Sequence, residues 1–197
     1  MFNKRQMLSK KHPKKILFFR ESTFKVAELI FTYPNRVFHL RLLEKETGFS
    51  TTAIISSIEE LESYSIVLIQ QGPLTKNISA NIDSYEYNYY KLVFNIYRLK
   101  KYGFIDSLIE IYQTPETIAL FGSYAKGEDI EESDIDFLVI STHKPQQTLL
   151  NNFILKMEKE LKRKVNIHHI PNLKKSSDAF RNTAANGIVL YGYLKVI

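Results

Sequence analysis

Gly122-Ser123-Tyr124-Ala125-Lys126-Gly127, followed by Ser133-Asp134-Ile135-Asp136-Phe137-Leu138-Val139-Ile140, is the stretch that decides the fold of the C-terminal half. The apolar run 117–121 precedes it and predicts a short buried strand. If that strand ends at Gly-Ser and leads into a helix, backbone N–H groups and one hydroxyl point at the same place. Such an arrangement favours an anion, and the glycine lets it approach closely. The first part of the stretch is therefore a candidate phosphate site.

The second part of the stretch carries two acids on one face of a predicted strand. Asp134 and Asp136 are two residues apart, so their carboxylates project from the same side, while Ile135, Phe137 and Val139 can be buried on the other. Adjacent carboxylates repel each other and are stabilised by a hard cation with oxygen ligands. Mg2+, or Mn2+ in its place, is expected, because triphosphate oxygens can complete its octahedron. Asp134 and Asp136 are thus candidate metal ligands and catalytic residues.

Gly122-Ser123 followed by Asp134-Ile135-Asp136 resembles the signature of the DNA polymerase beta superfamily, specifically its minimal nucleotidyltransferase branch. An isolated Asp-x-Asp pair is usually a solvated surface feature, but the strands and the Gly-Ser turn around this one make chance a poor explanation. The resemblance covers roughly residues 104 to 197. Within it we expect a strand at 164–170, a closing segment at 187–192, and a long helix whose apolar stripe is Leu150, Phe153, Ile154, Met157 and Leu161.

The resemblance implies a metal-dependent transfer of a nucleoside monophosphate, AMP from ATP, to an acceptor hydroxyl. Family acceptors include a protein tyrosine, a nucleic-acid end and small hydroxylated compounds, and relatives often act as the antitoxin of a toxin–antitoxin pair. The implied nucleotide-binding residues are Gly122, Ser123, Lys126 and Ser133.

Two positions depart from the family pattern. Relatives usually carry a third carboxylate on the strand after the long helix, where this chain has Asn166 as the matching candidate catalytic residue. An amide can offer an oxygen to a metal but cannot act as a base, so His168 on the same face is an alternative proton acceptor. His168 is equally compatible with an ordinary half-buried strand histidine. Tyr124 stands where relatives often have arginine, although Lys126 keeps one cation near the phosphates.

Three helical patterns and a hairpin precede this domain. The first helix is expected from Ser22 as its cap to the break at 33–35, and the second over 38–47, with Gly48 as a left-handed cap. The third is expected over 50–64, with Ser50 in its N-cap cluster. A strand at 66–69, a loop after Gly72 and a returning strand through 90–92 complete the pattern.

This order resembles a winged helix-turn-helix domain over roughly residues 21 to 95, with 50–64 as the recognition helix. The implied function is binding of double-stranded DNA, for which the candidate contacts are Ser50, Thr51, Thr52, Ser56 and Lys76. The predicted recognition helix lacks Lys and Arg and carries Glu59, Glu60 and Glu62. A domain used only for dimerisation or protein contact is therefore the alternative. Tyr85, Tyr87, Tyr89 and Tyr90 are interpreted as packing residues of a strand.

The predicted organisation is α+β: a basic tail at 1–20, a winged helix-turn-helix domain at 21–95 and a polymerase-beta-like α/β nucleotidyltransferase domain at 96–197. A linker helix is expected at about 96–113, interrupted near Gly103. The tail contains seven basic residues and no acidic one, which suits a polyanion or merely aids solubility: Lys4, Arg5, Lys10, Lys11, Lys14, Lys15 and Arg20.

The composition places the chain among ordinary globular proteins. It has 197 residues, a formal charge of +6 and no cysteine, which excludes disulfides and thiolate metal sites. The sequence lacks a secretory signal pattern and a membrane-spanning apolar run, so a cytoplasmic protein without membrane contact is expected. Expected partners are a nucleoside triphosphate, duplex DNA, a toxin-like protein and a second copy in a homodimer. Three functions stay open: an active transferase, a DNA-binding regulator that binds nucleotide without turnover, and a pure interaction protein.

Overall fold

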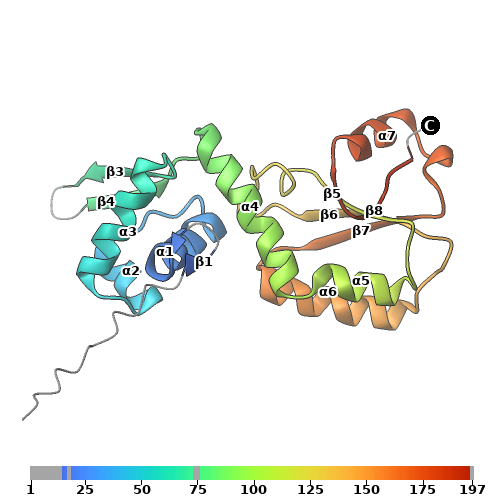
Figure 1. Cartoon of the computed structure of the whole chain (residues 1–197), viewed down its shortest axis with the longest axis horizontal. Helices are drawn as coiled ribbons and strands as arrows, with labels where there is room; N and C mark the ends of the chain where they lie inside the picture. Colours follow the sequence, from blue (N-terminus) through green and yellow to red (C-terminus); the bar gives the residue numbers. More distant parts are fainter. Residues whose placement is uncertain (1–14, 17–18, 73–75, 196–197) are drawn as a thin grey trace, which may run out of the picture.

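The computed structural model describes residues 15–16, 19–72 and 76–195 of the chain. It forms two units connected by a long helix, α4 (Tyr85–Lys101), as Figure 1 shows. The N-terminal unit consists of β1 (Lys15–Ile16), β2 (Phe19–Arg20), α1 (Glu21–Thr32), α2 (Leu40–Thr47), α3 (Thr51–Ser63), β3 (Val67–Gln71) and β4 (Lys76–Ala80). The C-terminal unit consists of α5 (Phe104–Ile111), β5 (Thr117–Phe121), β6 (Ile135–Ile140), α6 (Gln147–Leu161), β7 (Val165–Ile170), the short 3-10 helix Leu173–Lys175, α7 (Asp178–Ala185) and β8 (Ile188–Gly192). The chain is therefore a mixed α+β protein, as the sequence predicts.

The N-terminal unit packs α1, α2 and α3 around one apolar core, which the β3–β4 hairpin completes. The order of three helices followed by a hairpin agrees with the sequence prediction, whereas the winged helix-turn-helix assignment stays a prediction. Most of the predicted basic tail lies outside the described residues. Of its last members, Lys15 and Arg20 belong to the paired strands β1 and β2, and Arg20 forms an ion pair with Glu60 at 3.0 Å.

The helix ends follow local capping rules, with two corrections to the predicted starts. Gly48 has φ of 75° and its N–H donates to the Glu44 carbonyl at 2.8 Å, and the Ser50 hydroxyl caps α3 by accepting from the N–H of Ala53. The first helix begins at Glu21 instead of Ser22, whose hydroxyl accepts from Ser57. The second begins at Leu40, because Phe38 instead pairs with Ile78 of the hairpin.

The tyrosine-rich stretch is helical, so its assignment to a returning strand was wrong. The returning strand β4 ends at Ala80, and the Ser84 hydroxyl then accepts from the N–H of Tyr87 and starts α4. In a helix, Tyr85 and Tyr89 share an exposed face, and Tyr87 is buried in the N-terminal core. The domain boundary predicted at 95–96 therefore falls inside α4.

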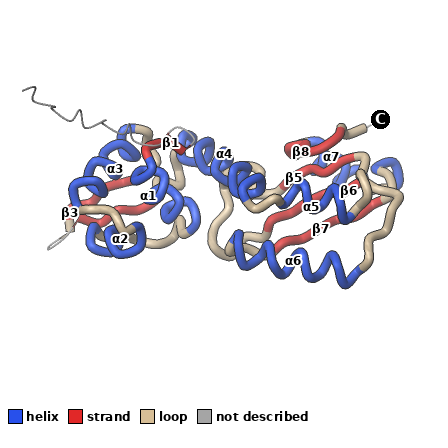
Figure 2. The backbone as a smooth tube through the Cα atoms, turned by 60° about the horizontal axis from the view of Figure 1, so that its bottom comes forward, coloured by secondary structure: helices blue, strands red, loops and turns tan. Residues whose placement is uncertain are grey.

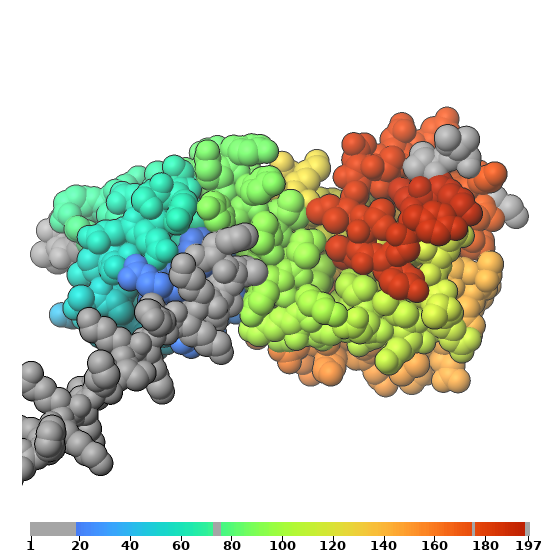
Figure 3. Space-filling view, in the orientation of Figure 1, coloured from blue at the N-terminus to red at the C-terminus, as the bar shows by residue number. Residues whose placement is uncertain are grey.

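Helix α4 contributes residues to both cores and ends at Lys101, just before Gly103, where the sequence predicts an interruption. Tyr87 and Phe94 belong to the N-terminal core, whereas Leu99 belongs to the core of the C-terminal unit. Gly103, with φ of 63°, separates α4 from α5, as the sequence predicts. In the space-filling view, α4 in green lies between the cyan N-terminal unit and the red C-terminal segment (Figure 3). No helix among the described residues is long and apolar enough to span a bilayer.

The C-terminal unit is built on a four-stranded sheet with the order β7-β6-β5-β8, in which only β6 and β7 are parallel. Helices α5 and α6 cover one face of this sheet, and α7 lies on the other (Figure 2). The predicted strands at 164–170 and 187–192 are present as β7 and β8, and Leu150, Met157 and Leu161 of α6 are buried as expected. The α7 face carries the candidate site.

Candidate active site

Strand β6 separates an apolar side from a polar one by simple alternation. Ile135, Phe137 and Val139 are buried in the core beneath α5 and α6, as their spacing predicts. Asp136 projects toward the opposite face, because successive residues of a strand point to opposite sides. In register, Asp136 stands between Phe121 of β5 and Asn166 of β7. The ends of three strands therefore bring the Gly-Ser turn, the acids and Asn166 together.

Asn166 lies between the two carboxylates. Its side-chain Nδ2 donates to Asp134 Oδ2 and to Asp136 Oδ1, each at 3.1 Å. Asp134 and Asn166 are exposed, and Asp136 is half-buried. Neutral amide hydrogens thus satisfy part of the hydrogen-bonding capacity of two acids that would otherwise face each other. The Asn166 amide thus bridges the two acids.

The backbone at Gly122 lies directly against the Asp136 carboxylate. A Cβ at Gly122 would be 2.9 Å from Asp136 Oδ2, and Gly122 has φ of 76°, a conformation that favours glycine. Any side chain here would push on the carboxylate. Asp136 therefore faces the turn that begins at Gly122, and Asn166 connects this acid to Asp134.

The segment after Ser123 is a series of turns, and the expected helix is absent. The N–H groups of Lys126 and Glu128 both donate to the Ser123 carbonyl at 3.0 Å. Gly127 has no room for a side chain, since a Cβ there would overlap the Asn88 carbonyl of α4. The dipole of a helix N-terminus consequently does not contribute to anion binding, which leaves the turn backbone, the Ser123 hydroxyl and cations nearby.

The remaining predicted nucleotide-binding residues differ in their surroundings. Ser123 is half-buried and Lys126 is exposed. The Ser133 hydroxyl accepts from the N–H of Ile130 at 2.9 Å, which closes the turn just before Asp134. Ser133 thus orients the segment that carries Asp134 and keeps its own O–H free to donate.

Two histidines on β7 occupy different environments. His168 is exposed on the same face as Asn166, its Nε2 is 3.8 Å from Asp136 Oδ1, and its ring packs beside Phe121 and Phe180. His169 points to the other face, where its Nε2 is 2.8 Å from the Ser141 carbonyl oxygen. Of the two, only His168 stands where it can meet a substrate held by the acids.

The donor set fits a hard divalent cation that shares its ligands with a substrate. The described residues contain no group of three His, Cys, Asp or Glu side chains arranged for a metal. Two carboxylates and an amide remain, and oxygen ligands of this kind suit Mg2+, which commonly takes one or two carboxylates plus phosphate oxygens. Asp134 and Asp136 would hold the ion, and Asn166 could turn its amide oxygen toward it.

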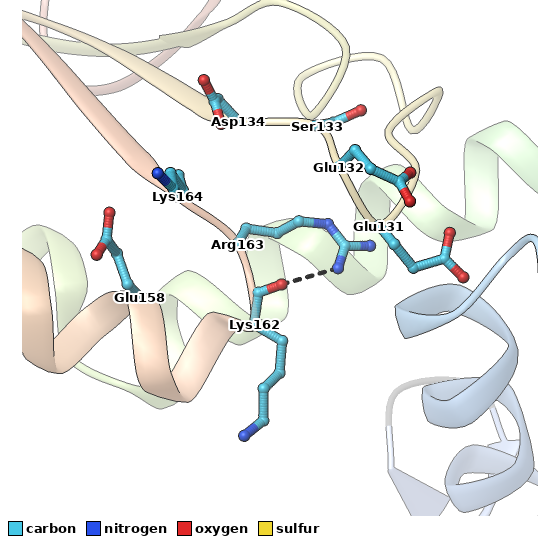
Figure 4. Close-up of a pocket in the computed structure, with 8 residues that line it drawn as sticks. All are labelled: Glu131, Glu132, Ser133, Asp134, Glu158, Lys162, Arg163 and Lys164. Atoms are coloured by element: carbon cyan, nitrogen blue, oxygen red, sulfur yellow. Dashed lines mark hydrogen bonds between the residues drawn. The ribbon is translucent and has the colours of Figure 1, made fainter.

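A groove of about 580 Å³ begins at Asp134 and follows the start of β7 (Figure 4). Acidic residues of the β5–β6 loop form one wall, and basic residues after α6 form the other. It is lined by Glu131, Glu132, Ser133, Asp134, Glu158, Lys162, Arg163 and Lys164. Of the two acids, Asp134 lines this groove and Asp136 does not.

The predicted DNA-binding residues are only partly together. Thr51 and Lys76 line one groove between α2, α3 and the hairpin. The sequence did not single out its other polar members His39, Arg41, Glu44 and Gln71. Thr52 is exposed at the start of α3, and the Ser50 hydroxyl caps that helix. Ser56 lies elsewhere: Arg20 Nη2 donates to its hydroxyl at 3.0 Å, next to Glu60.

Comparison with known proteins gives one family match and several structural likenesses. A crystal structure of a toxin-antitoxin with AMP-PNP is 24% identical over 46% of this chain and 71% of that chain, with a TM-score of 0.38. A toxin-antitoxin MntA-HpeT mutant is 21% identical over 46% and 70%, with a TM-score of 0.37. A tri-AMPylated Shewanella oneidensis HEPN toxin in complex with MNT antitoxin is 21% identical over 50% and 73%, with a TM-score of 0.36. No curated protein matches the chain significantly.

The family match coincides with the C-terminal unit. The family described as polymerase beta, nucleotidyltransferase, matches residues 104–194, which run from the first residue of α5 to just beyond β8. The turn at Gly122, the acids of β6 and the four-stranded sheet all lie inside this range. Residues 104–194 therefore match the polymerase beta nucleotidyltransferase family, over slightly less than half of the chain.

Proposed function

We propose that this protein is a metal-dependent nucleotidyltransferase that moves a nucleoside monophosphate, AMP from ATP, to an acceptor hydroxyl. One observation carries the proposal: in a segment that matches the nucleotidyltransferase family, Asp134 and Asp136 converge on Asn166 beside the turn at Gly122. Mg2+ bound by these acids would neutralise charge on the phosphate under attack and on the leaving pyrophosphate.

In this proposal the protein's residues hold the substrate, and the proton of the acceptor hydroxyl goes to a group other than Asn166. The acceptor oxygen attacks the α-phosphorus, the bond from that phosphorus to the oxygen bridging to the β-phosphorus breaks, and pyrophosphate leaves. The Ser123 hydroxyl, the turn backbone and Lys126 would bind the distal phosphates. Asn166 cannot accept the acceptor's proton, so this proton goes to solvent or to the exposed His168.

The test is transfer of label from α-labelled ATP in the presence of Mg2+. Acceptors to be offered are tyrosine-containing proteins, including a candidate toxin partner, nucleic-acid ends and hydroxylated small molecules. Asp136→Asn should abolish product, and the matched control Asp106→Asn, an exposed acid paired with Lys100 at 2.9 Å, should keep it. Transfer that survives in the Asp136 variant contradicts the proposal.

A regulator that binds nucleotide without turnover is the second candidate, and the Asn166 bridge favours it. The Asn166 amide already donates to both acids. Compared with a third carboxylate, it gives a cation less negative charge and provides no base. Under this alternative, calorimetry would detect Mg-ATP binding while no acceptor becomes labelled.

For either candidate, we propose that the N-terminal unit binds duplex DNA through the groove of Thr51 and Lys76. Arg41 and Lys76 supply the positive charge that α3 lacks, and Glu44 is the acid of the same groove. Binding should weaken as salt increases, and Arg41→Gln should reduce the slope of log affinity against log salt by about one. Lys45→Gln, an exposed lysine at the end of α2, is the control. Sedimentation of the free protein and of its DNA complex would also show whether two copies bind together.

A further inference from the structure

A cluster of buried charged residues lies outside the site and holds the loop between β5 and β6, which carries part of the site. The Asp129 cluster consists of Asp129, Lys91, Asn95 and Arg163, whose exposed fractions are 2%, 0%, 1% and 5%. Asp129 belongs to the loop between β5 and β6, which begins with Gly122 and ends with Asp134. The other members come from α4 and from the junction of α6 with β7. Charged residues are almost never fully buried unless they are paired, so the burial of these side chains depends on their contacts with one another.

Every polar group of the Asp129 carboxylate has a partner. Asn95 Nδ2 donates to Asp129 Oδ1 at 2.8 Å, and Lys91 Nζ and Arg163 Nη2 each lie 3.4 Å from Oδ2. Lys91 Nζ also donates to the Asp129 backbone carbonyl. The loop is thus bound by side chain and backbone at the same residue.

The same cluster fixes two further points. Asn95 Nδ2 donates to the Tyr124 carbonyl at 3.0 Å, next to Ser123. Arg163 Nη2 donates at 2.8 Å to the carbonyl of Thr32, the last residue of α1. Between these points Gly127 packs so tightly on α4 that a Cβ would be 2.9 Å from the Leu92 backbone nitrogen. The loop is therefore held at Tyr124, Gly127 and Asp129, by residues of both units.

The pairing of β5 with β6 brings Gly122 beside Asp136, and these contacts hold the loop that connects the two strands. The Gly-Ser turn is at one end of the loop and Asp134 at the other, and triphosphate binding requires both at a fixed separation. Tyr87 and Phe94 of α4 belong to the N-terminal core. Lys91 lies between them in the sequence, and Asn95 directly follows Phe94. The N-terminal unit thereby reaches the nucleotide site through one helix.

We propose that Asp129 is a positioning residue, through which α4 holds the loop between the Gly122–Ser123 turn and Asp134 in the conformation that binds Mg2+ and triphosphate. This inference rests on the proposed function, because it concerns binding of Mg2+ and triphosphate at that site. Asp129 itself touches neither.

The experiment compares Mg-ATP affinity by calorimetry and hydrogen exchange of residues 122–134 in the full-length wild type and four full-length variants. Asn95→Ala removes two contacts of the loop and leaves no additional charge unpaired, whereas Asp129→Asn removes the carboxylate. Both should raise the Mg-ATP Kd at least tenfold and speed exchange of the loop. Asp129→Glu, which keeps the charge, should restore part of the affinity, and Asp106→Asn should behave as wild type.

The readouts separate the possible failures. If Asp129→Asn does not fold, Asn95→Ala decides. Variants that fold and keep both wild-type affinity and wild-type loop protection overturn the positioning role. If the wild type binds no Mg-ATP, the proposed function fails, and the exchange of residues 122–134 still shows whether the cluster holds the loop. A uniform increase in exchange over the whole chain would indicate lost stability alone and would also overturn the proposal.

Discussion

Gly48 and Gly122 have nearly the same backbone conformation in very different surroundings. Their φ values are 75° and 76°, but a Cβ at Gly48 would meet nothing within 4 Å, whereas one at Gly122 would meet Asp136. Gly48→Ala and Gly122→Ala should each cost about 1–2 kcal/mol of stability from the left-handed conformation. Only Gly122→Ala should also weaken Mg-ATP binding, by roughly tenfold. Thermal unfolding and calorimetry on both variants measure the two effects, and equal affinities would refute a role for this contact.

Asn166 offers a second test at the scale of one residue. In Asn166→Asp, three carboxylates meet where an amide now bridges two, and each like-charge pair costs between about 1 and 4 kcal/mol at 4 Å, depending on the effective dielectric constant. The variant should therefore unfold at a lower temperature without metal and gain more from Mg2+ than the wild type does. Thermal melts with Mg2+ and with a chelator check this. An equal Mg2+ effect in both proteins would mean that the cation does not bind at these acids.

At the scale of elements, the sequence was informative where periodicity and caps act locally. The strands on either side of the Gly-Ser turn, the stripe of α6 and the caps at Gly48 and Ser50 were predicted because neighbouring residues determine them. The tyrosines of α4 were misassigned, since their spacing of two suggests a strand while Ser84 and the N-terminal core impose a helix. The Asp129 cluster was missed because its members come from residues 91 to 163, and only the fold brings them together.

Lys91 makes α4 sensitive to pH in a predictable direction. Burial lowers the pKa of Lys91 from 10.5 to about 8, a change that Asp129 opposes and Arg163 reinforces, with Glu131 nearby and the Tyr87 ring 5.6 Å away. Between these two values the unfolded chain binds more protons than the folded one, so stability rises with pH, by roughly 3 kcal/mol at most. Burial raises the pKa of Tyr87 and of Tyr124, so stability falls again above pH 10, the ordinary value for tyrosine.

The corresponding experiment is urea unfolding of the wild type and Lys91→Met at pH values from 7.5 to 10. The wild type should become more stable over this range, and the variant should show a flatter profile. Lys100→Met, at an exposed position of the same helix, should keep the wild-type slope. Parallel profiles for the wild type and Lys91→Met would show that Lys91 keeps its proton in the fold.

At the scale of the whole molecule, the boundary of the family match and the boundary of the folding unit differ. The match begins at residue 104, after α4, but Asp129 and Arg163 of the C-terminal unit have their partners Lys91, Asn95 and the Thr32 carbonyl before that point. Cutting the chain at 104 leaves Asp129 and Arg163 to pair only with each other in a site open to water. The fragment therefore loses the hydrogen bonds and the ion pair that α4 gives to Asp129, and also Leu99 from its apolar core.

We therefore expect a fragment of residues 104–197 to unfold without cooperativity or to remain aggregated, although it contains the whole matched domain. A fragment of residues 84–197 keeps the cap of α4, Lys91 and Asn95, and should recover a cooperative thermal transition at a lower temperature than the full chain. Arg163 still lacks the Thr32 carbonyl there, and Tyr87 and Phe94 lose the N-terminal core that buries them. If 104–197 alone melts as cooperatively as the full chain and binds Mg-ATP equally well, α4 is a passive linker. If 84–197 alone recovers, the folding unit that contains the matched segment includes α4 as a structural part.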